Sequence, residues 1–296
     1  MIVGNFSFEN FQIDTSYKGN LNKDIDKSEK KLSSYFKNKK DYDSAFLNVF
    51  EINKKEIKAG ITSHHFLAKN LIANFFSGID GNEIRNIILI GPDHYGELDK
   101  SKIDIVTTKL SWDTPFGQMD SNLEIQDKLL TFDYIKENDS VFRNEHSIYT
   151  LVPFIKKSFP KVRIVPLIIK NNKDYKKYID VGNDIKMVVG EGALIIISSD
   201  FSHNVSIINS QENDLKSIES LKGLNEENID NVNSDCRACL AILLGYLEDE
   251  EFDFYLKDNK NSSDFGSQDK TVTSYVSGYY IKSNITTFLL LFKNFI

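Results

Sequence analysis

The chain is poor in cysteine and carries no excess of basic residues. It has two cysteines in 296 residues, too few for the disulfide framework of a small secreted domain or for a zinc site made of four cysteines. Lysine and arginine number 36 against 43 aspartate and glutamate residues, so the net charge is −7, and no basic face stands out. We therefore expect neither nucleic acid nor an anionic membrane surface among the binding partners.

Long apolar segments are also absent. The longest strongly apolar run covers residues 288–292 and is far too short to span a bilayer. Residues 1–10 do not combine a basic segment with an apolar core, so no signal peptide is visible and we expect a cytoplasmic protein. No internal repeat or linker is visible, which predicts a single domain over residues 1–296 with a peripheral polar segment over residues 1–55.

The hydrophobic pattern predicts an α/β fold. Near-continuous apolar runs of strand length cover residues 87–90, 162–169 and 193–197, as expected of strands that are buried on both faces. Residues 57–61 predict a further short strand, and apolar residues with helical spacing follow it between residues 66 and 76. Further helices are predicted over residues 148–159 and, with a more polar composition, near residues 212–223. Together with two closing strands near the carboxyl terminus, this pattern predicts a mixed central sheet flanked by helices.

All five histidines fall at predicted element boundaries. Four of them come just after a predicted strand, in the crevice where open α/β sheets bind ligands, namely His64, His65, His94 and His203. His64 and His65 also lie at a helix amino terminus, whose dipole favours the neutral imidazole that binds metals. The fifth, His146, is at the start of a predicted helix.

Two further residues extend this pattern toward a metal site. Asp200 follows the strand over residues 193–197, and Cys236 begins a predicted helix, a position that stabilises a thiolate. Two histidines with either the cysteine or the aspartate would bind a metal ion and leave coordination positions open for a substrate. Each residue also has an ordinary structural interpretation, because a histidine at a strand end is commonly a hydrogen-bonding group and Asp200 is a candidate helix cap.

Cys236 and Cys239 have the spacing of a redox pair. The pair lacks the flanking residues of that class and opens a long apolar helix, so we expect Cys239 to be a buried core thiol. A redox pair is the alternative interpretation.

Six short motifs, in order along residues 57–282, resemble those of the Memo family, called AmmeMemoRadiSam system protein B in many bacteria and archaea. They are Ser63-His64-His65, Gly91-Pro92-Asp93-His94, Trp112-x-Thr114-Pro115-x-Gly117, Glu145-His146-Ser147-Ile148, Ser198-Ser199-Asp200-Phe201-Ser202-His203 and Asp235-Cys236-Arg237. The chain departs from the family pattern at two of these motifs. Ser63 stands where a proline is usual, and Cys236-Arg237-Ala238 replaces Cys-Gly-Arg.

The resemblance implies a fold like that of the class III extradiol dioxygenases, with a non-haem metal ion bound by two histidines and one cysteine. Transferred to this chain by position, the ligands are His64, His94 and Cys236. His65 is an alternative to His64, because the two histidines are adjacent in a motif that departs from the family pattern.

The same resemblance assigns three residues to the pocket around the metal. Asp200 and His203 would line it, with His203 in the position of the acid/base histidine of the dioxygenases, and His146 would be a further pocket residue. We expect iron as Fe²⁺ first, with copper or zinc as alternatives. With iron, the predicted activity is the oxidation of a small organic substrate by O₂, and His203 would move protons.

Two other functions stay open. The pocket of an adaptor would bind a peptide or a metabolite without catalysis, and a metal-dependent hydrolase would use Asp200 or His203 to activate a metal-bound water. The family name also implies a functional link to the other AmmeMemoRadiSam system proteins, including a radical SAM protein.

Overall fold

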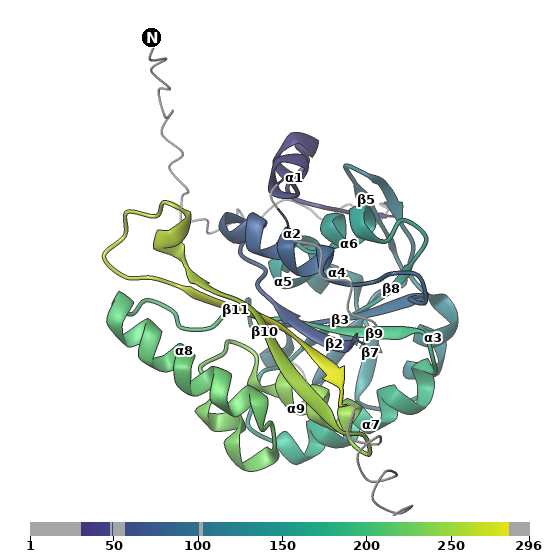
Figure 1. The fold of residues 1–296 in the computed structure, drawn as a ribbon. Helices are drawn as coiled ribbons and strands as arrows, with labels where there is room; N and C mark the ends of the chain where they lie inside the picture. The colour runs from purple at the N-terminus through teal and green to yellow at the C-terminus, as the bar shows by residue number, and fades with distance from the viewer. Residues whose placement is uncertain (1–30, 48, 50–56, 101–102, 284–296) are drawn as a thin grey trace, which may run out of the picture.

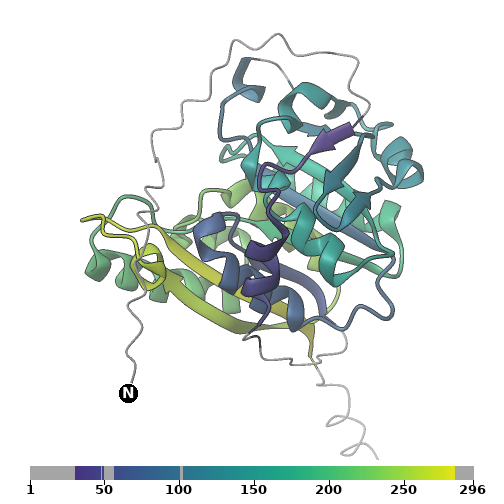
Figure 2. The same cartoon turned by 90° about the horizontal axis from the view of Figure 1, so that it is seen from above.

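The main sheet has eight strands, and it lies within the described residues 31–47, 49, 57–100 and 103–283 of the computed structural model (Figure 1). The strands lie side by side in the order β10-β11-β2-β9-β3-β8-β4-β7. Their bounds are Ile57–Thr62 for β2, Asn86–Pro92 for β3, Ile105–Thr107 for β4, Ile135–Glu137 for β7, Arg163–Ile169 for β8, Ala193–Ser198 for β9, Phe252–Asn261 for β10 and Ser274–Lys282 for β11. A second, small sheet consists of β1 (Lys31–Ser33, the purple arrow in Figure 2), β5 (Ser111–Thr114) and β6 (Gly117–Met119).

The four central strands of the main sheet run parallel. β2 pairs with β9, β9 with β3, and β3 with β8 in parallel register, whereas β11 joins β2 and β4 joins β8 in antiparallel register. Every residue of β3 and β9 is buried. Burial on both faces explains why these strands read as continuous apolar runs. The prediction of a mixed sheet flanked by helices is confirmed.

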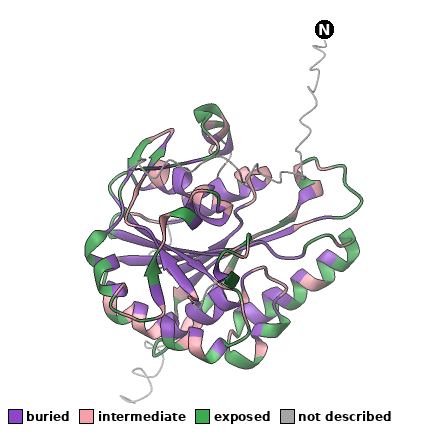
Figure 3. Ribbon diagram, turned by 180° about the vertical axis from the view of Figure 1, so that it is seen from behind, coloured by how far each residue is buried: buried purple, intermediate pink, exposed green. Residues whose placement is uncertain are grey.

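Two hydrophobic cores lie on opposite faces of the sheet. Successive residues of β3 alternate between them, with Ile88 and Ile90 in one core and Ile87 and Leu89 in the other. The first core is closed by α3 (Leu123–Leu129), α7 (Tyr175–Val189), α8 (Ile207–Lys222) and α9 (Arg237–Leu247). The second is closed by α1 (Lys39–Ala45), α2 (Lys69–Ser77), α4 (Asp139–Phe142), α5 (His146–Tyr149) and α6 (Val152–Ser158). Figure 3 shows the sheet in the colour of buried residues and the outer helix faces in that of exposed ones.

Two predicted helices differ from the observed ones at their ends. The helix expected over residues 148–159 is divided into α5 and α6, and Pro153 in the first turn of α6 has no N–H to donate to the turn before it. The helix expected from residue 212 begins earlier, at Ile207. Its cap is Ser206, whose hydroxyl accepts a hydrogen bond from the backbone N–H of Asn209.

The polar segment predicted over residues 1–55 contributes to the second core in its described part. Tyr42 of α1 is fully buried, and the ring of Phe36 stacks on that of Phe66 with the centroids 3.8 Å apart. The apolar element at residues 286–296 lies outside the described residues. None of the described helices has the length and apolar character needed to cross a membrane.

Candidate metal centre

The candidate site lies where three parallel strands end and helix α9 begins. Strand β9 lies between β2 and β3, so the residues that follow these strands meet at one edge of the sheet. His64 follows β2, His94 follows β3 and Asp200 follows β9, whereas Asp235 comes from the loop before α9. This carboxyl edge is where open α/β sheets bind ligands.

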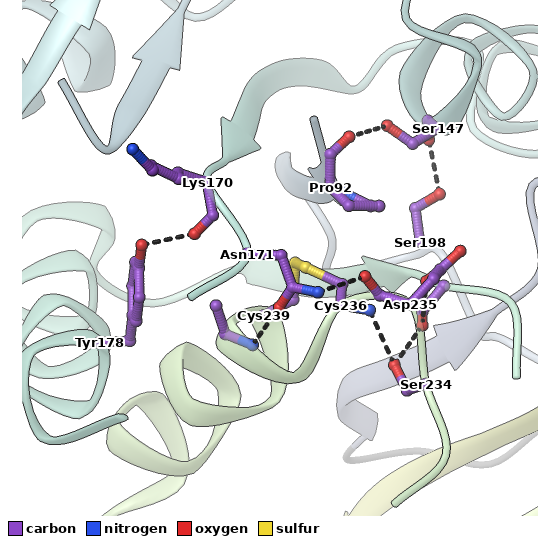
Figure 4. The surroundings of a disulfide bond; sticks show 12 residues. Pro92, Ser147, Lys170, Asn171, Tyr178, Ser198, Ser234, Asp235, Cys236 and Cys239 are labelled. Carbon is purple, nitrogen blue, oxygen red and sulfur yellow. Dashed lines mark hydrogen bonds between the residues drawn. A yellow bond between two sulfur atoms is a disulfide. The ribbon is translucent and has the colours of Figure 1, made fainter. Parts of the chain in front are cut away.

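His64 is held in a single tautomer by a buried serine. The imidazole is 2% exposed, and its Nδ1 lies 3.1 Å from Ser198 Oγ. The hydroxyl of Ser198 already donates its only hydrogen to the carbonyl oxygen of Ser147, at 2.5 Å (Figure 4). Ser198 Oγ must therefore accept a hydrogen bond from Nδ1–H of His64. In the neutral ring this places the lone pair on Nε2, a buried atom without a hydrogen-bond partner.

His94 is held by a buried carboxylate instead. Its Nδ1 lies 2.8 Å from Oε1 of Glu145, and its backbone N–H donates to Oε2 at 2.9 Å. Glu145 is fully buried, and its Oε1 also accepts the backbone N–H of Ser147 at 2.9 Å. A carboxylate on Nδ1 turns the Nε2 atom of His94 toward the centre of the site, as the outer partners of metal-binding histidines do.

Helix α5, which Glu145 caps, lies directly against the end of β3. Gly91 makes this possible, because a Cβ at that position would lie 2.5 Å from Ser147 Oγ. Ser147 Oγ in turn donates a hydrogen bond to the carbonyl oxygen of Pro92 at 3.0 Å. The glycine of the Gly-Pro-Asp-His motif thus allows Glu145 to reach His94.

Asp235 lies between the histidines. Its Oδ2 is 3.4 Å from Nε2 of His64, 3.4 Å from Nε2 of His94 and 3.7 Å from Nε2 of His203. Its Oδ1 accepts hydrogen bonds from the hydroxyl of Ser199 at 2.7 Å and from the backbone N–H of Asp200 at 3.2 Å. Two ligand atoms that each lie about 2.1 Å from one tetrahedral metal ion are about 3.4 Å apart. The separations of Asp235 Oδ2 from the first two histidines match this spacing.

Two overlapping groups of potential ligands result. One ring nitrogen from each of His64, His94 and His146 lies within 4.8 Å of the other two, and one ligand atom from each of His64, Asp200 and Asp235 does likewise. The ring centroid of His146 is 4.1 Å from that of His94 and 5.0 Å from that of His64. His64 belongs to both groups, so any metal ion in this site is expected to bind it.

Burial and the two carboxylates determine the charges of the site. Burial lowers the pKa of His94, but hydrogen bonds to Asp235 and Glu145 outweigh it and raise this pKa to about 10. Burial and the neighbouring imidazoles lower the pKa of His146 to about 3. Burial raises the pKa of Asp235, yet the surrounding histidines hold it well below its usual range. In the metal-free protein His94 and Asp235 therefore form an ion pair, and a divalent cation would replace the proton of His94.

The family model of the Memo-like proteins matches residues 22–279 of this chain. The chain belongs to the Memo family. Among curated proteins, a MEMO1 family protein of Caldivirga maquilingensis is 34% identical over 146 residues, which cover 47% of this chain and 50% of the relative. A MEMO1 family protein of Aquifex aeolicus is 29% identical over 145 residues, 48% of this chain and 53% of the relative.

A third relative, a MEMO1 family protein of Methanococcus maripaludis, is 33% identical over 150 residues, 48% of this chain and 51% of the relative. The chain spans about half the length of the curated relatives it matches. These relatives are named for their family and not for a reaction.

In this Memo-family chain, Ser63, which stands where the family usually has a proline, forms hydrogen bonds that connect two parts of the site. The hydroxyl of Ser63 donates a hydrogen bond to Oδ1 of Asp200 at 2.5 Å, which the usual proline has no group to do. Ser63 Oγ also accepts the backbone N–H of His65. The ring of His65 is directed elsewhere, with Nδ1 2.6 Å from the hydroxyl of Tyr275. Of the two adjacent histidines, the structure brings His64 into the cluster.

The remaining predicted residues also have defined positions. The side chain of His203 is 43% exposed at the rim of the site, and the carboxylate of Asp235, 3.7 Å from its Nε2, raises its pKa. Cys236, in contrast, is bonded to Cys239 in a disulfide, and both residues are fully buried (Figure 4). Cys236 does not belong to either group of potential ligands among the described residues. Its role as a ligand stays a prediction, whereas the expectation that Cys239 is a free core thiol is wrong.

Three residues of the site were not predicted from the sequence. They are Glu145, Ser198 and Asp235. Each occurs in a motif that carries the family resemblance, either next to a residue that was assigned a role or two positions from one. Two of them could have been found from their positions, because an acidic residue stands directly before His146 and another directly before Cys236. Carboxylates commonly orient metal-binding histidines or bind the metal together with them.

Proposed function

We propose that this Memo-family protein binds one divalent metal ion between His64, His94 and Asp235 and uses it to oxidise a small organic substrate. The observation that carries the proposal is that two imidazole Nε2 atoms converge on one carboxylate oxygen while both Nδ1 atoms have partners of their own. Two histidines and one carboxylate with open positions are typical of non-haem Fe(II) oxygenases. We therefore propose Fe²⁺ as the metal, with copper or zinc as the alternatives.

The donor atoms fit such an ion. His64 Nε2 is buried and lacks a hydrogen-bond partner, which is costly unless the atom has a ligand to bind. The carboxylate of Asp235 would balance part of the charge of the ion, and Glu145 would increase the basicity of His94. When bound, iron would supply Lewis-acid and O₂-activating chemistry.

The other predicted pocket residues would serve the substrate. His203 lies at the rim with a raised pKa, so its Nε2 is suited to hold a proton near neutral pH and give it up to a substrate oxygen. The ring of His146 is neutral and packs beside His94, which suits it to orient an uncharged substrate. Asp200, fixed by Ser63, would keep the open side of His64 polar.

Metal analysis of protein purified without oxygen tests the proposal. The parent should bind one metal ion per chain, and His64→Ala and His94→Ala should each weaken binding by at least ~100-fold, because each removes a ligand whose outer partners alone contribute about 10–100-fold. His65→Gln is the matched control, since it changes the adjacent histidine outside the cluster and should bind metal like the parent. Parental binding in both alanine variants would disprove the site.

The nature of the bound ion separates the alternative functions. Full zinc occupancy without any redox response would favour a hydrolase, and failure to bind any metal would favour an adaptor that recognises a peptide or metabolite. We also propose, from the family resemblance, that the protein acts together with other AmmeMemoRadiSam system proteins. Co-purification of the chain with a radical SAM partner from its own cells would test that link.

A further inference from the structure

Two neighbouring residues compete for one position in the candidate metal centre. The family resemblance implies Cys236 as the third ligand, but the carboxylate of Asp235 lies beside His64 and His94 in the structure, and the sulfur of Cys236 is bonded to Cys239. We propose that Cys236 and Cys239 are a redox pair that selects the third ligand of the metal. Asp235 is the ligand when the disulfide is formed, and Cys236 is the ligand when the disulfide is reduced. This inference rests on the proposed function.

The position of the pair allows both states without rebuilding the fold. Cys236 caps helix α9 and Cys239 lies in its first turn, with the Cα atoms 5.2 Å apart. Residues three positions apart on a helix face each other, so the two sulfurs stay neighbours whether or not they are bonded. The helix therefore keeps the two thiols close enough for an external disulfide or O₂ to take up two electrons and two protons from them and so form the disulfide again.

The frame around the pair is fixed. The side-chain amide of Asn171 donates to the carbonyl oxygen of Asp235 at 2.7 Å and accepts the backbone N–H of Ala238 at 3.2 Å, so it bridges the loop and the helix (Figure 4). Helix α9 also packs directly on α7, because a Cβ at Gly182 would overlap the backbone at Ile242. Reduction should thus change only the rotamer of Cys236 and the contacts of the Asp235 carboxylate.

The rotation of the Cys236 side chain connects two defined states of the site. Cys236 and Asp235 are consecutive, and the backbone N–H of Cys236 donates to Ser234 Oγ at 3.0 Å. In the oxidised state Oδ1 of Asp235 is held by Ser199 and Asp200, which leaves Oδ2 directed at the histidines. In the reduced state the freed thiol of Cys236 would replace Oδ2 of Asp235 as the third ligand, and Asp235 would keep its hydrogen bonds through Oδ1.

The chemistry of the change is ordinary thiol–disulfide exchange. Two thiol groups of an external reductant give two electrons and two protons, the bond between the two cysteine sulfurs breaks to give two thiols, and the reductant becomes a disulfide. When the thiol of Cys236 binds the metal, its proton passes to solvent. A carboxylate favours hard ions such as Fe²⁺ and Mn²⁺, whereas a thiolate favours Zn²⁺ and Cu⁺. The pair would therefore change the metal preference of the site.

Binding of Co²⁺ to the full chain tests the inference, because a thiolate ligand gives Co²⁺ a near-ultraviolet charge-transfer band and a carboxylate does not. The air-oxidised parent, with its thiols counted by mass spectrometry after alkylation, should bind Co²⁺ without this band. The parent reduced with dithiothreitol and desalted without oxygen should show it, and Cys239→Ser should show it in either condition. Cys236→Ser is the matched control and should lack the band throughout.

The dependence on Asp235 gives a second measurement. Asp235→Asn should weaken Co²⁺ binding about tenfold or more in the oxidised protein and less than about threefold in the reduced protein. The reduced parent carries no substitution, so it reports on the inference even if the cysteine variants fold poorly.

Three results would overturn the inference. Two free thiols in the air-oxidised parent would exclude the redox pair, and a missing thiolate band in the reduced parent would exclude Cys236 as a ligand. Both of these results leave His-dependent Co²⁺ binding, and so the proposed function, in place. Absence of Co²⁺ binding in every redox state would overturn the inference and the proposed function together.

Discussion

The turns after β2 and β3 present one imidazole each to the same point, but their surroundings differ. His64 is almost fully buried and is held by the neutral hydroxyl of Ser198, whereas the side chain of His94 is 22% exposed and is held by the carboxylate of Glu145. The first turn holds Nδ1 of its histidine with a neutral hydroxyl and brings no carboxylate to that nitrogen. The second turn stabilises a positive charge near His94, carried by a proton or by a metal ion.

The difference predicts that the two turns depend on their supporting groups to different degrees. Glu145 is fully buried and accepts hydrogen bonds from the backbone of His94, the ring of His94 and the backbone of Ser147. Ser198 makes two hydrogen bonds and carries no charge. A buried charge is costly to leave without its partner, whereas the loss of one neutral hydrogen bond costs much less.

The largest expected effect is that of Glu145→Ala. It removes the cap of α5 and the partner of His94, so the free energy of unfolding should fall by about 3–5 kcal/mol. Urea unfolding measures the change, and Glu83→Ala, at an exposed position, should stay within about 0.5 kcal/mol of the parent. A loss no greater than that of the control would show that Glu145 does not stabilise the His94 turn.

Glu145→Gln should affect metal binding more than stability. The amide keeps the shape of the side chain but loses the charge, so His94 becomes less basic and metal affinity should fall by about 10–100-fold. Competition with a coloured chelator measures the dissociation constant. Unchanged affinity would mean that the carboxylate acts only on the fold.

The pH dependence of the metal-free protein should reveal the charge at His94. The pKa of His94 is raised to about 10, above the value of about 6.5 for an unfolded chain, so its ion pair stabilises the fold fully below pH ~6.5 and loses this effect as the pH rises through about 10. We expect the free energy of unfolding to fall by roughly 1–2 kcal/mol between these two pH values, after allowance for solvent screening.

Thermal unfolding of the chelator-treated protein between pH 6 and pH 10 measures this slope, and Glu145→Gln should flatten it. A steeper slope in the metal-loaded protein than in the metal-free one would contradict the exchange of a proton for a metal ion at His94.

Ser198→Ala should give the smallest effect. It removes one neutral acceptor from His64 Nδ1, so the free energy of unfolding should fall by about 1 kcal/mol and metal affinity by about tenfold, the low end of the range for such a partner. The matched control is Ser210→Ala, a buried serine of α8 whose hydroxyl has no hydrogen-bond partner and which should not change metal affinity. If Ser198→Ala lowered metal affinity more than Glu145→Gln does, the His64 turn would depend on its supporting group more than the His94 turn, contrary to our expectation.

The strands and most of the helices could be predicted from the sequence because their signals are local. The apolar runs at residues 87–90, 162–169 and 193–197 became β3, β8 and β9, each buried on both faces. The error at residues 148–159 came from Pro153, whose missing N–H divides a pattern that is helical throughout in its apolar spacing.

The sequence predicted that histidines form the candidate site, but it did not predict which side-chain atoms meet there. Histidines at strand ends are visible along the chain, and the structure brings His64, His94, His146 and His203 around one centre. The sequence pattern could not distinguish Asp235 from Cys236, because consecutive residues in a loop face different ways and the loop conformation depends on Asn171 of a distant segment.

The sequence by itself determined which strands are buried on both faces, that histidines stand at the strand ends, and the family to which the chain belongs. Only the tertiary structure decided which atoms meet, because Ser198 lies 134 residues from His64, and Glu145 lies 51 residues from His94. Partners this far apart come together only when the parallel strands take their places in the sheet, and hydrophobic periodicity records the face of a residue but not its neighbour across the sheet.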